Sequence, residues 1–133
     1  MTKTTKKSSR MRGENPANPT RDAILASLKA HPSLRRHPAE KKERLYISGF
    51  QMSNGRTLAL GKHAASLQPI WVRLADFPAH ALPTIKREFY SPEAGRSSNL
   101  HIFGGDFKNG NLVCLFPQTC ADALKIVDHL LAC

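Results

Sequence analysis

Two apolar segments joined by Asn54-Gly55 constrain the fold of this chain more than any other feature of its sequence. The first segment, RLYISGFQM, and the second, RTLALG, are rich in residues that favour β-strands. Asn-Gly between two such segments is the strongest short-range signal for a β-hairpin, because both central residues of the tight turn need positive φ. The sequence therefore predicts an antiparallel strand pair over residues 44–61, with Asn54 and Gly55 at its tip.

A second strong pattern lies near the C-terminus. NLVCLF, residues 111–116, is a continuous apolar run and indicates a strand that is buried on both faces. TCADALKIVDHLLA then predicts a helix in which Thr119 is the N-cap and Asp122 lies near the positive end of the helix. Its apolar residues recur at spacings of three and four and so form one stripe: Ala123, Leu124, Val127, Leu130 and Leu131. We expect this stripe to cover one face of the sheet.

Two helical segments are predicted before the hairpin. TRDAILASLKA, residues 20–30, has an apolar face and ends before Pro32, because the residue before a proline disfavours helical backbone angles. Either Asn18 or Thr20 caps this helix, and the first alternative places a proline at the first helical position. Residues 38–43 are strongly charged and indicate a second, shorter turn of helix.

The middle of the chain holds shorter patterns. Residues 70–74, IWVRL, and residues 100–103, LHIF, indicate two more strands. Asn109-Gly110 is another hairpin signal, placed between LHIF and the next apolar run. Residues 84–89, TIKREF, have two interpretations, one or two turns of helix or an edge strand, because prolines precede them closely.

Together these segments predict an α+β fold. We expect a small antiparallel sheet of about four to five strands, with the C-terminal helix packed on one face and a short N-terminal helix. Residues 1–18 contain almost no apolar side chains and are expected to form a disordered basic arm. Residues 19–133 are expected to form a single α+β domain.

Positive charge is concentrated in the first third of the chain. The sequence has a formal net charge of +10, and residues 1–44 contain twelve basic and four acidic residues, a net +8. Such a positive field attracts polyanions, most commonly nucleic acid. We therefore predict nucleic-acid contacts from the basic residues of the arm and of the segment that follows it: Lys3, Lys6, Lys7, Arg10, Arg12, Arg35, Arg36, Lys41, Lys42 and Arg44.

The polar segment SPEAGRSSN adds two candidates that lie outside the basic third. The planar guanidinium of Arg96 suits a phosphate or carboxylate, and Ser97, Ser98 and Asn99 can donate beside it. The alternative is that Arg96 is merely solvated and Asn99 caps a turn. Tyr46, Phe50 and Trp71 would offer stacking surfaces for bases if exposed, although such residues more often lie in the core.

These features favour a non-catalytic nucleic-acid-binding protein, regulatory or accessory, that uses its basic arm and a surface of sheet and loop to contact DNA or RNA. The first alternative is a protein-interaction module, an adaptor or an inhibitor of a nucleic-acid enzyme, whose basic surface meets an acidic partner. The second alternative is a metal-dependent nuclease built on Asp76, Glu88 or Asp106. We assign no catalytic residue, metal ligand or cofactor, because the sequence lacks phosphate-loop, dinucleotide and zinc-ligand spacings.

The same sequence argues against membranes and secretion. No apolar run approaches the roughly 18 residues needed to span a bilayer, and no hydrophobic segment follows the basic N-terminus as in a signal peptide. The three cysteines lack the spacing of a disulfide framework. We therefore expect a cytoplasmic protein that contacts no membrane.

Overall fold

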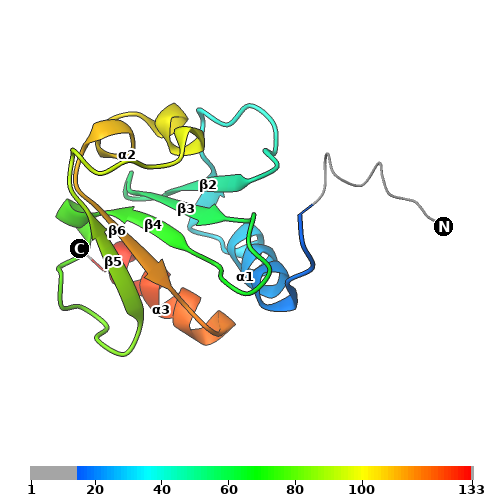
Figure 1. Ribbon diagram of the computed structural model, residues 1–133. Helices are drawn as coiled ribbons and strands as arrows, with labels where there is room; N and C mark the ends of the chain where they lie inside the picture. The colour runs from blue at the N-terminus through cyan, green and yellow to red at the C-terminus, as the bar shows by residue number, and fades with distance from the viewer. Residues whose placement is uncertain (1–14, 133) are drawn as a thin grey trace.

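Six antiparallel strands form one sheet in the order β1-β2-β3-β4-β6-β5 (Figure 1). The structure is a computed structural model and describes residues 15–132. The predicted α+β fold is confirmed, although the sheet has six strands where about four to five were expected. The strands are β1 (Leu34–Arg36), β2 (Ile47–Met52), β3 (Thr57–Gly61), β4 (Ile70–Arg73), β5 (Lys86–Tyr90) and β6 (Leu112–Phe116).

Helices cover both faces of this sheet. The helices α1 (Pro19–Ala30) and α3 (Cys120–Leu131) contact each other on one face, which we call the helix face (Figure 1). The 3-10 helix η3 (Ser98–Phe103) and the short helix α2 (Asp106–Asn109) lie on the opposite face, and a 3-10 turn, η2 (Leu74–Asp76), follows β4. Within the described residues, no helix has the length and apolar character needed to cross a membrane.

Side-chain caps explain where the two long helices begin. The Oδ1 atom of Asn18 accepts from the backbone N–H of Arg21 at 3.0 Å, with Pro19 at the first helical position, so the first of the two predicted caps is the correct one. The hydroxyl of Thr119 accepts from the N–H of Asp122 at 3.0 Å, as predicted. Both caps satisfy N–H groups that the first turn of a helix leaves unpaired.

Each face of the sheet has its own hydrophobic cluster. The larger cluster lies on the helix face, and its largest fully buried members include Leu28, Leu60, Ile70, Leu115, Ile126 and Leu130. The smaller cluster lies beneath η3 and α2 and contains Ile47, Ala59, Leu100, Phe107 and Leu112. Strand β6 contributes to both clusters, since alternate side chains of a strand point to opposite faces. This confirms that the run NLVCLF is a strand buried on both sides.

The predicted hairpin is present, with one difference at its tip. Strands β2 and β3 pair in register, and the loop of Ser53, Asn54 and Gly55 joins them. The N–H of Gly55 donates to the carbonyl of Met52, and Gly55 has a φ of +92°. No other residue of this loop has positive φ. The loop is therefore a three-residue turn that needs glycine at one position, and not the two-residue turn expected from Asn-Gly.

Two predictions for the chain between β5 and β6 are wrong, the strand LHIF and the hairpin turn at Asn109-Gly110. Residues 100–103 belong to the helix η3, in which Leu100 and Phe103, three residues apart, both face the sheet. A segment of four residues cannot distinguish a period of two from a period of three, so LHIF fitted either structure. Asn109-Gly110 is the end of α2 and not a hairpin tip, because η3 and α2 replace the strand that would have preceded it.

The helical turn predicted for residues 38–43 is also wrong. The segment begins with a turn, in which the N–H of Glu40 donates to the carbonyl of His37 at 2.9 Å, and continues as irregular backbone. Of the two interpretations of residues 84–89, the edge strand is correct: β5 pairs with β6 from Lys86 to Tyr90.

The boundary of the N-terminal arm differs from the expected one. Residues 15–18 contact the folded domain, because Asn15 donates to the carbonyl of Leu45 at 2.8 Å and Asn18 is buried. The remaining part of the predicted arm, residues 1–14, lies outside the described residues. The domain therefore includes at least four residues that composition alone assigned to the arm.

The close approach of η3 to β2 predicts the effect of a substitution at Gly49. A Cβ atom at this position would overlap the ring of Phe103, which is itself packed against His37 and Phe107. We expect Gly49→Ala to lower the free energy of unfolding by about 1–3 kcal/mol, because the ring has to move. The control is Gly95→Ala, where a Cβ atom meets no atom within 4 Å. Equal unfolding midpoints in urea for the two variants would contradict this packing.

Candidate nucleic-acid interface

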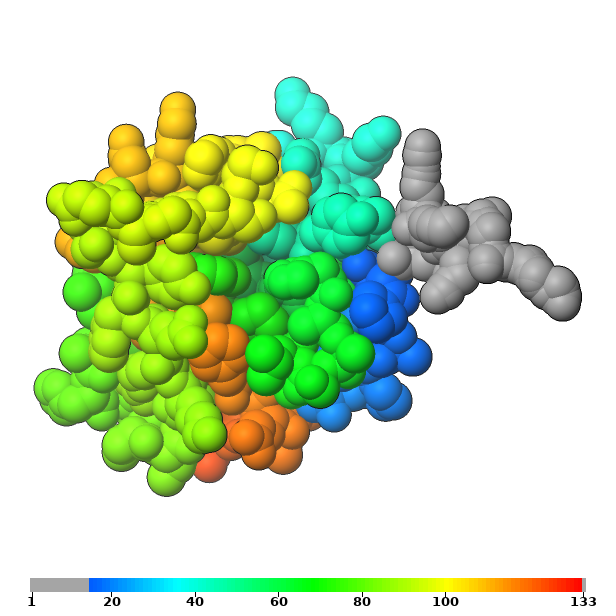
Figure 2. Space-filling view, in the orientation of Figure 1, coloured from blue at the N-terminus to red at the C-terminus, as the bar shows by residue number. Residues whose placement is uncertain are grey.

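A surface groove runs from the connection between β1 and β2 to the face of the sheet beside η3. It consists of two adjoining hollows, and Tyr46 and Asn99 line both of them. Figure 2 shows this side of the molecule, where the segment near Tyr46 (cyan), the connection after β3 (green) and η3 (yellow) surround the depression. We call it the basic–aromatic groove and define it by Lys41, Lys42, Glu43, Arg44, Tyr46, His63, Trp71, Ser97 and Asn99.

The basic half of the groove contains three of the predicted nucleic-acid-binding residues. Lys41 and Lys42 are exposed and Arg44 is half-buried. None of the three forms an ion pair with another of the residues 15–132. Their charges are therefore available to an external anion.

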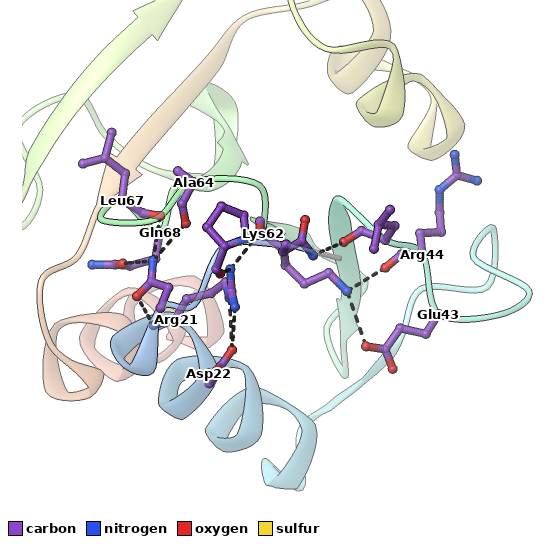
Figure 3. Close-up of polar contacts among 12 residues, drawn as sticks. Arg21, Asp22, Glu43, Arg44, Lys62, Ala64, Leu67 and Gln68 are labelled. Carbon is purple, nitrogen blue, oxygen red and sulfur yellow. Dashed lines mark hydrogen bonds and ion pairs between the residues drawn. The ribbon is translucent and has the colours of Figure 1, made fainter. Parts of the chain in front are cut away.

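The acidic side chains of the same segment have internal partners, which explains why the cations point outward. Glu43 accepts from the ammonium of Lys29 at 2.9 Å and from that of Lys62 at 3.3 Å. Lys62 also donates to the carbonyl of Arg44 at 2.6 Å (Figure 3). Glu40 is buried and accepts from the N–H of Gly49 at 3.1 Å. The segment is thus anchored from inside by its acids.

A buried arginine joins this anchor to α1. Arg21 is 6% exposed and donates to the carbonyl of Lys62 at 2.8 Å and to that of Pro16 at 3.1 Å (Figure 3). It also pairs with Asp22 at 2.9 Å. The charged groups are held by several hydrogen bonds each, which is the condition under which buried charge is tolerated. The connection after β3 is therefore fixed to both α1 and the basic segment.

The aromatic half of the groove offers surfaces on which bases can stack. Tyr46 is 42% exposed, and Trp71 is half-buried with its ring edge-to-face against Tyr90 at 4.7 Å between centroids. His63 is exposed beside them. By contrast Phe50 is 4% exposed within the helix-face cluster and offers no stacking surface. Two of the three aromatic candidates thus lie at the groove.

Arg35 and Arg36 lie at the edge of the sheet, outside the groove. Both are exposed on β1, where neighbouring side chains point to opposite faces. Arg35 donates to the side-chain carbonyl of Gln51, and Arg36 donates to the backbone carbonyl of Lys41 at 3.3 Å. Arg36 thereby supports the basic segment from the helix side. The arm residues Lys3, Lys6, Lys7, Arg10 and Arg12 lie outside the described residues.

Arg96 and Asn99, which were predicted to contact the same ligand, have different surroundings in the structure. The guanidinium of Arg96 donates to the backbone carbonyls of Ser91 at 2.6 Å and Asp106 at 2.8 Å, and more weakly to that of Ala94 at 3.4 Å. These bonds close the loop between β5 and η3 and occupy much of the guanidinium. Asn99 lies in the groove and donates to the hydroxyl of Ser97 at 3.3 Å.

The three carboxylates considered for a nuclease do not form a metal site. Asp76 pairs with Arg56 at 3.6 Å and with Arg73 at 3.5 Å, and Arg73 also pairs with Asp106 at 3.4 Å. Glu88 lies on β5 and accepts from the hydroxyl of Tyr90 at 3.3 Å. Across residues 15–132, no group of three or more metal-binding side chains comes together.

His63 is a groove residue that the sequence did not indicate. It lies in the connection after β3, far along the chain from Asn99, and no spacing rule links such positions. Comparison of the chain with protein-family models, curated proteins and solved structures gave no match. The arguments for function therefore come from the groove itself.

The two glutamates of the basic segment have opposite pKa shifts. Burial raises the pKa of Glu40 above its ordinary value of 4.5, against the opposing effects of its bond from Gly49 and the charge of Lys62. The hydrogen bond from Lys29 lowers the pKa of Glu43. Burial, with the charge of Arg35, lowers the pKa of the nearby His37.

These shifts predict opposite pH dependences for two matched variants. Above pH 4.5 the folded protein retains a proton on Glu40 that the unfolded chain has lost, so this contribution to stability is lost as pH rises through the folded pKa. We expect Glu40→Gln to gain stability relative to wild type as pH rises from about 4 to about 8. Glu43→Gln should lose stability relative to wild type at the acidic end, as pH rises from about 3 to about 5, because the ionised form that Lys29 stabilises is fully present only above the pKa of the unfolded chain. Urea unfolding curves from about pH 3 to about pH 8 test both variants, and parallel curves would contradict the assignment.

The contacts of Arg96 predict a structural effect. Arg96→Ala removes several hydrogen bonds to backbone carbonyls, and we expect the free energy of unfolding to fall by about 1–2 kcal/mol. Lys108→Ala is the control, because this exposed lysine lies in the adjacent α2 and has no side-chain hydrogen bond among the described residues. Thermal and urea unfolding measure the difference. An Arg96→Ala protein as stable as the control would show that the guanidinium is not needed by the loop.

Proposed function

We propose that this chain is a non-catalytic, cytoplasmic nucleic-acid-binding protein, regulatory or accessory, whose basic–aromatic groove binds a single strand. The observation that carries this proposal is the continuity along one groove of three cations that form no ion pair among residues 15–132 with the exposed ring of Tyr46 and the half-buried ring of Trp71. In this arrangement Lys41, Lys42 and Arg44 contact phosphates. Tyr46 and Trp71 supply stacking surfaces for the bases.

A single strand fits this chemistry better than a duplex. The faces of bases in a duplex are covered by their neighbours, so stacking on protein aromatics needs unstacked bases. Strand-binding proteins combine a positively charged groove with such aromatics, and this surface has both. Asn99 is placed to donate to or accept from a base edge between the two halves. The basic arm adds affinity that does not depend on sequence.

A second candidate is the protein-interaction module, which one observation favours. Phe89 is 54% exposed on β5, and β5 is an edge strand with β6 as its only partner in the sheet. An exposed edge with an apolar side chain can pair with a strand of another protein. This surface lies outside the groove, so variants distinguish the two candidates.

Removal of the groove cations is the first test of strand binding. We expect the triple variant Lys41→Gln, Lys42→Gln and Arg44→Gln to bind a roughly 12-nucleotide single strand at least about tenfold more weakly in low salt. The slope of log affinity against log salt should fall by about 2, because three phosphate contacts are lost. Fluorescence anisotropy with labelled DNA and RNA strands measures both quantities.

A charge-matched control keeps this test specific. The triple variant Lys86→Gln, Lys108→Gln and Lys125→Gln removes the same charge from exposed positions outside the groove. Deletion of residues 1–14 measures the arm separately. The proposal is wrong if wild type binds neither strand at low salt, or if both triple variants weaken binding equally.

The aromatic half of the groove is tested by Tyr46→Ala. We expect affinity to fall roughly tenfold with little change in the salt slope, because stacking on one base contributes about 1–3 kcal/mol and involves no counterion release. The matched control is Phe89→Ala, which removes the other strongly exposed aromatic ring named above. If Phe89→Ala abolishes capture of a protein partner while Tyr46→Ala leaves strand binding intact, the interaction module replaces strand binding as the function.

A further inference from the structure

A second pocket lies behind the basic segment, on the helix side of β2. Its volume is about 230 Å³. Leu34 and Phe50 form apolar walls, and Glu40 and Ser48 supply polar groups in its lining. Lys29, Arg35, Arg36 and Glu43 line the rest.

Glu40 and Ser48 are buried polar residues with unsatisfied atoms. Glu40 is 4% exposed and Ser48 is 3% exposed. The Oε1 atom of Glu40 accepts from Gly49, but neither Oε2 of Glu40 nor the hydroxyl of Ser48 has a hydrogen-bond partner among the described residues. Buried polar atoms are normally paired, because an unpaired one loses its hydrogen bonds to water without replacement. Two such atoms lining one pocket indicate a ligand that pairs with both.

The charged residues around the pocket indicate which chemical groups the two ends of this ligand carry. A buried carboxylate calls for hydrogen-bond donors at the inner end. Arg36 is exposed and forms no ion pair among the described residues, so it calls for an anion at the outer end, whereas Lys29 is already paired with Glu43 at 2.9 Å. A nucleotide has this layout, with N–H groups on its base and a phosphate at the other end.

Among the bases, guanine matches the carboxylate best. Its N1–H and exocyclic amino group are adjacent donors, and the neighbouring carbonyl can accept from the hydroxyl of Ser48. Uracil presents one N–H between two carbonyl oxygens, which a carboxylate repels. Adenine and cytosine offer an amino group next to an acceptor nitrogen, so each gives the carboxylate fewer donors.

The pocket adjoins the basic–aromatic groove. Glu43 lines both, and the segment that carries Lys41 and Lys42 separates them. A strand lying in the groove can therefore place a neighbouring nucleotide in the pocket by crossing this basic segment. This step rests on the proposed function, whereas binding of a free nucleotide does not.

We infer that this pocket binds the base of a guanine nucleotide, with Glu40 accepting from N1–H and the amino group, Ser48 donating to the carbonyl, and Arg36 contacting the phosphate. A buried carboxylate that reads a base in this way selects one nucleotide over the other three. The pocket thus gives base preference to a protein whose groove binds strands without one.

Titration with free nucleotides tests this inference directly. The probes are GMP, AMP, CMP and UMP, observed through the backbone amide NMR signals of Ser48 and Gly49. We expect GMP to bind at least about tenfold more tightly than UMP, and Glu40→Gln to abolish this preference. Ser48→Ala should weaken GMP binding, and Glu93→Gln, a change at an exposed glutamate outside the pocket, should have no effect. Circular dichroism verifies that each variant is folded.

A second experiment distinguishes binding of a free nucleotide from binding of a base within a strand. A thymidine oligonucleotide with one central deoxyguanosine should bind more tightly than the plain thymidine oligonucleotide, and Glu40→Gln should remove the difference. If GMP shifts neither amide signal, water alone satisfies the pocket and the inference is wrong even where strands bind the groove. If GMP binds but no strand does, the inference stands and the proposed function is wrong. Equal binding of all four mononucleotides also overturns the inference.

Discussion

The contact between the ring of Phe103 and the backbone of Gly49 sets the arrangement of the surface that we assign to nucleic-acid binding. Because Gly49 has no side chain, η3 lies directly on β2, and the ring of Phe103 also meets that of His37 at 4.9 Å between centroids. This contact holds the start of the basic segment against the same helix that carries Asn99. The groove lies beside this contact, where the basic segment, the connection after β3 and η3 come together.

Electrostatics decide which side chains of the basic segment face outward. Lys62 is 5% exposed and binds both Glu43 and the carbonyl of Arg44, and the buried Glu40 pairs with the backbone of β2. Burial of unpaired charge is costly, so Lys41 and Lys42, which have no acidic partner among the described residues, stay exposed. Glu43 is exposed as well, but its charge is paired with Lys29 and Lys62. The net charge of the sequence is thereby converted into a local positive surface next to Tyr46.

Sequence patterns predicted the elements in which local signals are long or chemically specific. The hairpin, the capped helices α1 and α3 and the doubly buried strand β6 are all present. The segments that were predicted wrongly or missed are short or irregular. LHIF was too short to show its period, β1 has three residues, and Asn15 looks like a linker residue until its hydrogen bond to the carbonyl of Leu45 is known. The prediction of site residues also succeeded only in part. The structure brings Lys41, Lys42, Arg44 and Asn99 together, whereas it directs Arg96 to backbone carbonyls.

The sequence alone determined the α+β class, the hairpin, the two main helices and the excess of positive charge in the first third of the chain. These features follow from periodicity, capping and turn chemistry, which act between residues close in the chain. Tertiary structure alone decided that Tyr46, His63, Trp71 and Asn99 share one groove and that Glu40 and Ser48 line one pocket with unpaired atoms. Such sites depend on contacts between segments tens of residues apart, and no local pattern specifies which of those segments meet.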